Sequence, residues 1–256
     1  MIIDTHAHLD DEQYEEDRES VINRAADEGV EMIINMGADI ASSYKAVKLA
    51  LSHDIIYAAV GIHPEEAEGM LEKDKYILSE LVSDNEKVLA IGEIGLDYHF
   101  RTDNKEIQKK VFIEQLDIAR QMHVPVSIHA RDAHGDLMQI LKKEGRGMQG
   151  VIHCYSGSVE MAKELFRMGW YIGADGPLTF KNSAKLPEVI KMMPLERLLI
   201  ETDSPYLTPP PYLGKRNDPS NVLLVAEELA RIKNMDVQEL IDITRENAMK
   251  IYQIHQ

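Results

Sequence analysis

Histidine and carboxylate residues recur at the ends of short apolar runs in this sequence. They are His6, His8, His63, Glu93, His129, His153, Glu201 and Asp203. Imidazole and carboxylate groups bind divalent cations in proteins, and the same groups accept and donate protons in hydrolysis. Several such groups aimed at one point would be costly to desolvate without a cation, so their convergence predicts a metal site.

Spacing within two of these runs strengthens the metal prediction. Residues i and i+2 of a β-strand point to the same face, so His6 and His8 are expected to face one pocket, and so are Glu201 and Asp203. A carboxylate shared by two ligand sets suits two divalent ions roughly 3.5–4 Å apart. We therefore expect two divalent metal ions per subunit. The imidazoles favour zinc, manganese or iron over magnesium, which prefers oxygen ligands, so the candidate ions are zinc, manganese and magnesium, with their identity left open.

The elements that must position these side chains are eight apolar, β-branched runs separated by amphipathic segments. Eight runs in 256 residues leave 256/8, or about 32 residues, for each strand and its helix. Most runs are apolar on both faces, as expected for parallel strands covered by helices. The runs are 1–8, 31–37, 55–62, 88–95, 124–130, 150–154, 170–175 and 197–203.

This alternation predicts an α/β protein with a (β/α)8 TIM barrel, a single domain over residues 1–256. Active sites of this fold form at the C-terminal ends of the strands, where the histidines and carboxylates fall. An open doubly wound sheet is the alternative. It would place a glycine-rich phosphate-binding turn after the first strand, whereas the sequence there is DTHAHLDD.

Composition excludes several classes of protein. The net charge of −16 argues against a broad basic face that coats nucleic acid, although a local phosphate site is compatible with it. No apolar run approaches the ~18–20 residues of a membrane span. The start carries no basic segment ahead of an apolar stretch. A single cysteine excludes an internal disulfide, so we expect a soluble cytoplasmic protein with no membrane association.

The sequence also resembles the TatD family of metal-dependent deoxyribonucleases, within the amidohydrolase-like superfamily. The resemblance runs in order from residue 4 to residue 222. The segments that carry it are DTHAHLD (4–10), GIHP (61–64), IGEIGLDY (91–98), IHARDA (128–133), HCYSG (153–157), ETDSPYLTP (201–209) and GKRNDPSNV (214–222).

The family pattern implies ligands for each ion. One ion would be bound by His6, His8 and Asp203, and the other by His129 and His153, with Glu93 bridging the two. His63 and Glu201 match family positions close to the ions, and both are candidates for proton transfer.

The sequence departs from the family pattern at two places. Leu213 stands where the family often has an arginine, and Ala174-Asp175 stands where apolar residues and glycine are usual. The first change could remove a phosphate contact, and the second could alter the floor of the pocket. Neither changes a metal ligand.

Residue types also indicate how a phosphodiester would be cleaved. Two divalent ions can activate water, neutralise charge at phosphorus and assist the leaving oxygen. Asp203 is the candidate that orients the water and accepts its proton. Arg131 suits a bidentate contact with phosphate. In the loop 204–218, Tyr206 is a candidate for stacking on a base, while the neighbouring cations Lys215 and Arg216 would bind phosphate.

The resulting hypothesis is a 3′-to-5′ exonuclease acting on single-stranded DNA ends, and its polarity is implied by the resemblance alone. Intact duplex is too wide for a pocket at the mouth of a barrel. We expect a monomer that needs no protein partner.

The alternative function is that of a hydrolase of an ester, amide or small phosphoester, including the ester of an aminoacyl-tRNA, because fold does not determine substrate. A third reading, an inactive barrel that binds metal or a protein, predicts a missing ligand, whereas the ligand set is complete.

Overall fold

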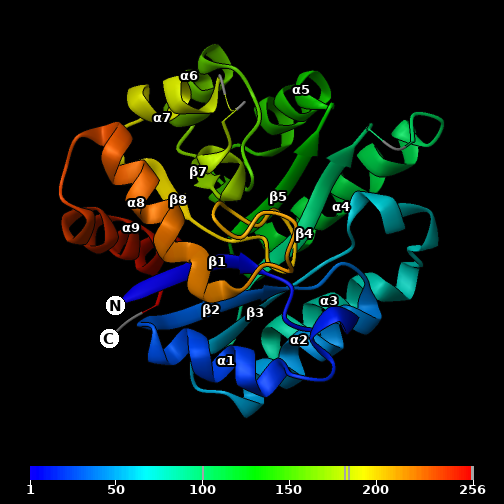
Figure 1. Ribbon diagram of the computed structural model, residues 1–256. Helices are drawn as coiled ribbons and strands as arrows, with labels where there is room; N and C mark the ends of the chain where they lie inside the picture. The colour runs from blue at the N-terminus through cyan, green and yellow to red at the C-terminus, as the bar shows by residue number, and fades with distance from the viewer. Residues whose placement is uncertain (100, 182, 184, 255–256) are drawn as a thin grey trace. The chain divides into compact units, whose positions relative to one another are not determined.

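A computed structural model describes residues 1–99, 101–181, 183 and 185–254 of the protein. Eight parallel strands form one sheet in the order β1-β2-β3-β4-β5-β6-β7-β8, and a helix follows each strand (Figure 1). A doubly wound sheet would reverse the strand order partway, so that alternative is wrong. The chain has the (β/α)8 barrel fold, which confirms the prediction.

The elements observed follow the predicted runs closely. The strands are β1 (Ile2–Ala7), β2 (Val30–Met36), β3 (Ile56–Val60), β4 (Val88–Asp97), β5 (Val126–Arg131), β6 (Gly150–Ile152), β7 (Tyr171–Ala174) and β8 (Leu198–Ile200). The helices are α1 (Arg18–Asp27), α2 (Ile40–Ser52), α3 (Glu72–Ser83), α4 (Lys105–Met122), α5 (His134–Glu144), α6 (Val159–Arg167), α7 (Leu186–Met192), α8 (Val222–Lys233) and α9 (Val237–Ile251). Among the described residues, none of these helices is long and apolar enough to span a bilayer.

Several strands end earlier than predicted, and beyond two of them the backbone turns left-handed. Strand β6 ends at Ile152 and β8 at Ile200, and beyond these ends Cys154 and Asp203 adopt left-handed backbone conformations with φ of 42° and 54°. A left-handed residue interrupts the extended backbone on which strand alternation depends. The expectation that Glu201 and Asp203 share one face of a strand is therefore wrong.

Contacts divide the chain into two compact units. The first unit comprises residues 1–35 and 154–256, and the second comprises residues 36–153. In the first unit, α8 and α9 pack on β1 and β8. In the second, α2 packs on β3 and α4 on β4. The expectation that residues 1–256 form a single domain stays a prediction.

Helix α4 holds the ends of two strands through buried glutamines. The Gln108 side chain accepts from the backbone N–H of Asp97 at 2.9 Å and donates to the Asp97 carbonyl at 2.8 Å. Gln115 makes the same pair of bonds with Ile62, at 2.7 and 2.9 Å. Both glutamines are at most 1% exposed. Because buried hydrogen bonds of this kind are costly to break, α4 fixes the backbone next to the predicted site residues of the second unit.

Candidate metal centre

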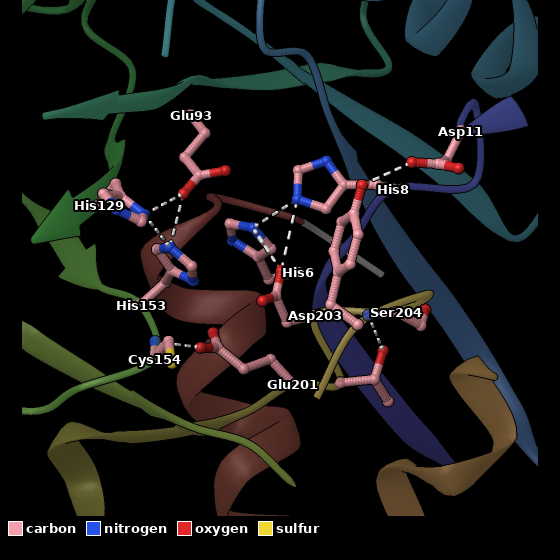
Figure 2. Close-up of polar contacts among 12 residues, drawn as sticks. His6, His8, Asp11, Glu93, His129, His153, Cys154, Glu201, Asp203 and Ser204 are labelled. Carbon is pink, nitrogen blue, oxygen red and sulfur yellow. Dashed lines mark hydrogen bonds and ion pairs between the residues drawn. The ribbon is translucent and has the colours of Figure 1, made fainter. Parts of the chain in front are cut away.

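The first unit holds a cluster of three potential metal ligands. His6 lies in β1, His8 follows that strand, and Asp203 follows β8. The Asp203 Oδ1 atom lies 3.6 Å from His6 Nε2 and 3.4 Å from His8 Nε2, and the two Nε2 atoms are 3.2 Å apart. Figure 2 shows the three side chains pointing toward one another. Two imidazole nitrogens and one carboxylate oxygen within 4.8 Å of one another form a donor set suited to one divalent cation.

Backbone contacts aim Asp203 at these histidines. The Asp203 N–H donates to the His6 carbonyl at 2.9 Å, and the His8 N–H donates to the Ser204 carbonyl at 2.7 Å. Asp203 itself has the left-handed backbone conformation, and its bond to β1 directs its side chain toward the two histidines. Asparagine and aspartate tolerate this conformation better than most residues.

The second unit holds a second cluster around Glu93 of β4. Its Oε1 atom lies 2.8 Å from His129 Nδ1 and 2.6 Å from His153 Nε2 (Figure 2). The two ring nitrogens are 3.2 Å apart. Glu93 is 3% exposed and His153 is 4% exposed. Glu93 is thus a buried carboxylate with two imidazole nitrogens in contact with one of its oxygens. These three groups are again ligands suited to a divalent cation.

His63 borders this second cluster. It caps the short helix η2 (Pro64–Gly69), and its Nδ1 atom accepts from the Glu65 N–H at 3.3 Å. Its Nε2 atom lies 3.7 Å from Glu93 Oε1. With the Nδ1 lone pair used for the cap, the proton of a neutral ring belongs on Nε2, which faces the cluster as a donor. This tautomer is assigned from the hydrogen bond.

The electrostatics of His129 indicate that the second cluster needs positive charge. Burial by itself lowers the pKa of His129. Hydrogen bonds and charge from Asp97 and Glu93 outweigh burial and raise that pKa to about 10. Two carboxylates on one imidazole thus favour a cation at this position, and a bound divalent ion would supply the charge in place of the ring proton.

Glu201 lies outside both clusters. Its side chain is fully buried, and its Oε1 atom accepts from the Cys154 N–H at 2.6 Å (Figure 2). A Cβ atom on Gly173 would lie 2.3 Å from the Glu201 carboxylate, so a larger residue there would displace that side chain. Burial first, and then the charge of Asp175, raise the pKa of Glu201 well above its usual value. Its catalytic role stays a prediction.

Two of the residues predicted to contact the substrate are exposed to solvent. Arg131 ends β5 and is exposed. Tyr206 is 47% exposed, its ring centroid lies 6.0 Å from that of His8, and its hydroxyl donates to Asp11 Oδ2 at 2.6 Å. The Asp11 contact holds the phenol ring beside the first cluster.

The two predicted phosphate-binding residues of the loop after β8 have different surroundings. The Lys215 Nζ atom lies 5.6 Å from the centroid of Tyr212. The guanidinium of Arg216 instead pairs with Asp17, at 2.9 and 2.6 Å, and lies 4.5 Å from the ring centroid of Tyr14. Contact between Arg216 and substrate stays a prediction, and it would compete with this ion pair.

Sequence reasoning missed Asp97 at the end of β4. Its Oδ2 atom lies 2.9 Å from His129 Nε2, although no role had been assigned to it. Its even spacing from Glu93 within one strand is the signal that could have found it.

The chain is similar to known proteins over almost its whole length. Residues 3–253 match the family described as "TatD related DNase". This protein belongs to the TatD family. The chain is 48% identical over 256 residues to the "Uncharacterized metal-dependent hydrolase YabD" of Bacillus subtilis, covering 100% of both chains.

Solved structures of TatD proteins have the same fold as this chain. The structure titled YJJV, a TatD homolog from Escherichia coli, gives a TM-score of 0.92 with 30% identity, covering 99% of this chain and 98% of that one. A TatD family hydrolase from Entamoeba histolytica gives 0.88 with 29% identity, covering 98% and 97%. The resemblance predicted from the TatD motifs is confirmed.

Proposed function

We propose that this metal-dependent hydrolase of the TatD family is a deoxyribonuclease that removes nucleotides from the 3′ ends of single-stranded DNA. The observation that carries the proposal is the pair of imidazole–carboxylate clusters: the ligand atoms of His6, His8 and Asp203 lie within 4.8 Å of one another, and those of Glu93, His129 and His153 lie 2.6 to 3.2 Å apart. The family description and the names of the relatives support hydrolysis assisted by metal ions.

Each cluster is proposed to hold one divalent ion. His6, His8 and Asp203 would bind one, and Glu93, His129 and His153 the other. Imidazole donors favour zinc or manganese, and magnesium is the third candidate. When bound, two such ions lower the pKa of water, neutralise phosphate charge and assist the leaving oxygen. Active-site residues of this fold gather at the strand C-termini, which supports a role of these ligands in the reaction. That Glu93 is shared by both ions stays a prediction.

The chain's own side chains would orient the water and move its proton. Asp203 has a side chain that is 13% exposed, so one carboxylate oxygen can accept a proton from the attacking water. His63, with its proton on Nε2, would donate to an oxygen of the phosphate. Arg131 would bind another phosphate oxygen through its guanidinium.

The exposed side chain of Tyr206 favours single-stranded DNA as the substrate. Tyr206 offers a ring face for a base, and Lys215 offers a cation for the neighbouring phosphate. Because the net charge is −16, phosphate binding must be local, and DNA affinity should depend weakly on salt. A monomer, a cytoplasmic location and independence from a protein partner stay predictions.

Product analysis on labelled DNA tests the proposal. We expect the metal-loaded protein to release mononucleotides from a 5′-labelled single strand in a ladder that shortens from the 3′ end. A chelator should abolish this release, and adding zinc, manganese or magnesium should restore it. Undiminished release after chelation would contradict the metal mechanism. Cleavage of an ester panel or of aminoacyl-tRNA, with intact oligonucleotides, would favour the alternative.

Replacing Tyr206 by alanine should weaken binding of single strands. Stacking of one base contributes about 1–3 kcal/mol, so KM should rise roughly 5- to 150-fold with little change in kcat. Tyr206→Phe is the matched control, because it keeps the ring and removes only the bond to Asp11. Equal KM values for the alanine variant and the unmodified protein would show that the ring binds no base.

A further inference from the structure

A buried carboxylate next to the second cluster contacts the outer ring nitrogen of one of its histidines. Asp97 is 2% exposed and lies at the end of β4. Its Oδ2 atom is 2.9 Å from His129 Nε2, and its Oδ1 atom accepts from the backbone N–H of His99 at 2.8 Å. Both carboxylate oxygens therefore have partners, which orients the group in one direction.

The position of Asp97 is fixed from the other side by α4. Gln108 bonds both the N–H and the carbonyl of Asp97, and its amide nitrogen also donates to Asn104 Oδ1 at 2.9 Å. Gln108 is 1% exposed. A glutamine with its amide fully used in this way has a single favourable orientation, so the backbone that carries the Asp97 carboxylate is rigid.

Asp97 acts as the acceptor in its contact with His129. Its Oδ1 atom accepts the His99 N–H, and its Oδ2 atom lies at hydrogen-bond distance from His129 Nε2. A carboxylate that meets a hydrogen-bonding group at each oxygen acts as an acceptor, so the ring nitrogen that faces Asp97 carries the proton.

The opposite nitrogen of the same ring faces the ligand cluster. His129 Nδ1 lies 2.8 Å from Glu93 Oε1 and 3.2 Å from His153 Nε2. A neutral imidazole has one N–H and one lone pair, and a metal ion needs the lone pair. We infer that Asp97 is a positioning residue that keeps the His129 proton on Nε2, so that Nδ1 is the atom that binds the cation. The inference rests on the proposed metal-binding role of His129.

Spectroscopy of the unmodified full-length protein tests this assignment directly. Histidine labelled with ¹⁵N distinguishes the two ring nitrogens through their two-bond couplings to ring protons, and His129→Gln assigns the His129 signals. On adding zinc, we expect the Nδ1 signal to shift as a metal ligand while Nε2 keeps its proton. Zinc on Nε2, with the proton on Nδ1, would overturn the inference and leave the metal site intact. Unchanged His129 signals would overturn the metal-binding role and the inference together.

Metal affinity of Asp97→Asn gives an independent measurement. Removing such a partner of a metal ligand typically weakens metal binding by about 10- to 100-fold. We expect this loss for one zinc ion, measured by competition with a chromophoric chelator, with the affinity of the other ion unchanged. The matched control is Asp132→Asn, because Asp132 also pairs with a histidine, His99 Nδ1 at 2.9 Å, but its side chain is 64% exposed.

The outcomes of the affinity measurement separate a positioning role from a merely structural one. Loss of one zinc ion in Asp97→Asn, at an unchanged unfolding temperature of the metal-free protein, supports the inference. Two zinc ions bound as tightly as in Asp132→Asn would overturn it. If Asp97→Asn does not fold, the ¹⁵N measurement on the unmodified protein decides the question by itself.

Discussion

Glu93→Gln is expected to lower kcat for release of nucleotides by about 10³-fold or more, which corresponds to roughly 4 kcal/mol of lost transition-state stabilisation. Glu93 Oε1 lies within 2.8 Å of ring nitrogens from both His129 and His153. Glutamine has nearly the same shape, but it removes the negative charge and one acceptor from a residue that is 3% exposed. The second cluster would then lack its only proposed carboxylate ligand.

Kinetics and metal content together test this expectation for Glu93. Single-turnover rates on a labelled single strand give the loss in rate, and metal analysis after dialysis gives the number of ions retained. Glu66→Gln makes the same chemical change at an exposed position of η2 and should leave both quantities unchanged. A Glu93→Gln variant with a normal rate would exclude Glu93 from the reaction.

Asp203→Asn is expected to lower kcat by about 10²- to 10⁴-fold, the usual contribution of a positioned proton acceptor. Asparagine cannot accept the proton of the attacking water, and it is a weaker ligand than a carboxylate beside His6 and His8. Because asparagine tolerates a left-handed φ, the backbone at this position should be retained. The loss should therefore come from chemistry and metal binding, with the fold intact.

Asp132→Asn is a matched control for Asp203 as well. Asp132 has the same φ of 54° and is largely exposed, so the same substitution tests the backbone effect without the cluster. Both variants should unfold at the temperature of the unmodified protein when metal is removed. If the two lose activity equally, the role given to Asp203 is wrong.

Much of the fold could be predicted because its signals are local. Apolar, β-branched runs alternating with amphipathic segments identify strands and helices without reference to distant residues. His6 and His8 could be paired because strand spacing alone places them on one face. Glu93 and His129 could be selected because each lies at the C-terminal end of such a run, where this fold builds active sites.

Strand spacing failed where the backbone leaves the extended conformation. Asp203 has a left-handed backbone, and its N–H is bonded to the carbonyl of His6 in β1, near the start of the chain. Glu201, two residues earlier, is fully buried against the Cys154 backbone. Arg216 looked like a phosphate-binding residue, yet its ion pair with Asp17 forms only once distant segments have packed.

By itself, the sequence determined the family, the fold and the residue types that gather at the strand ends, because these depend on composition, period and motif. Tertiary structure decided which atoms meet. It set the oxygen of Glu93 against two ring nitrogens, and the carboxylate of Asp97 against the outer nitrogen of His129. Such contacts join residues tens of positions apart, and their distances follow from packing and from buried hydrogen bonds such as those of Gln108.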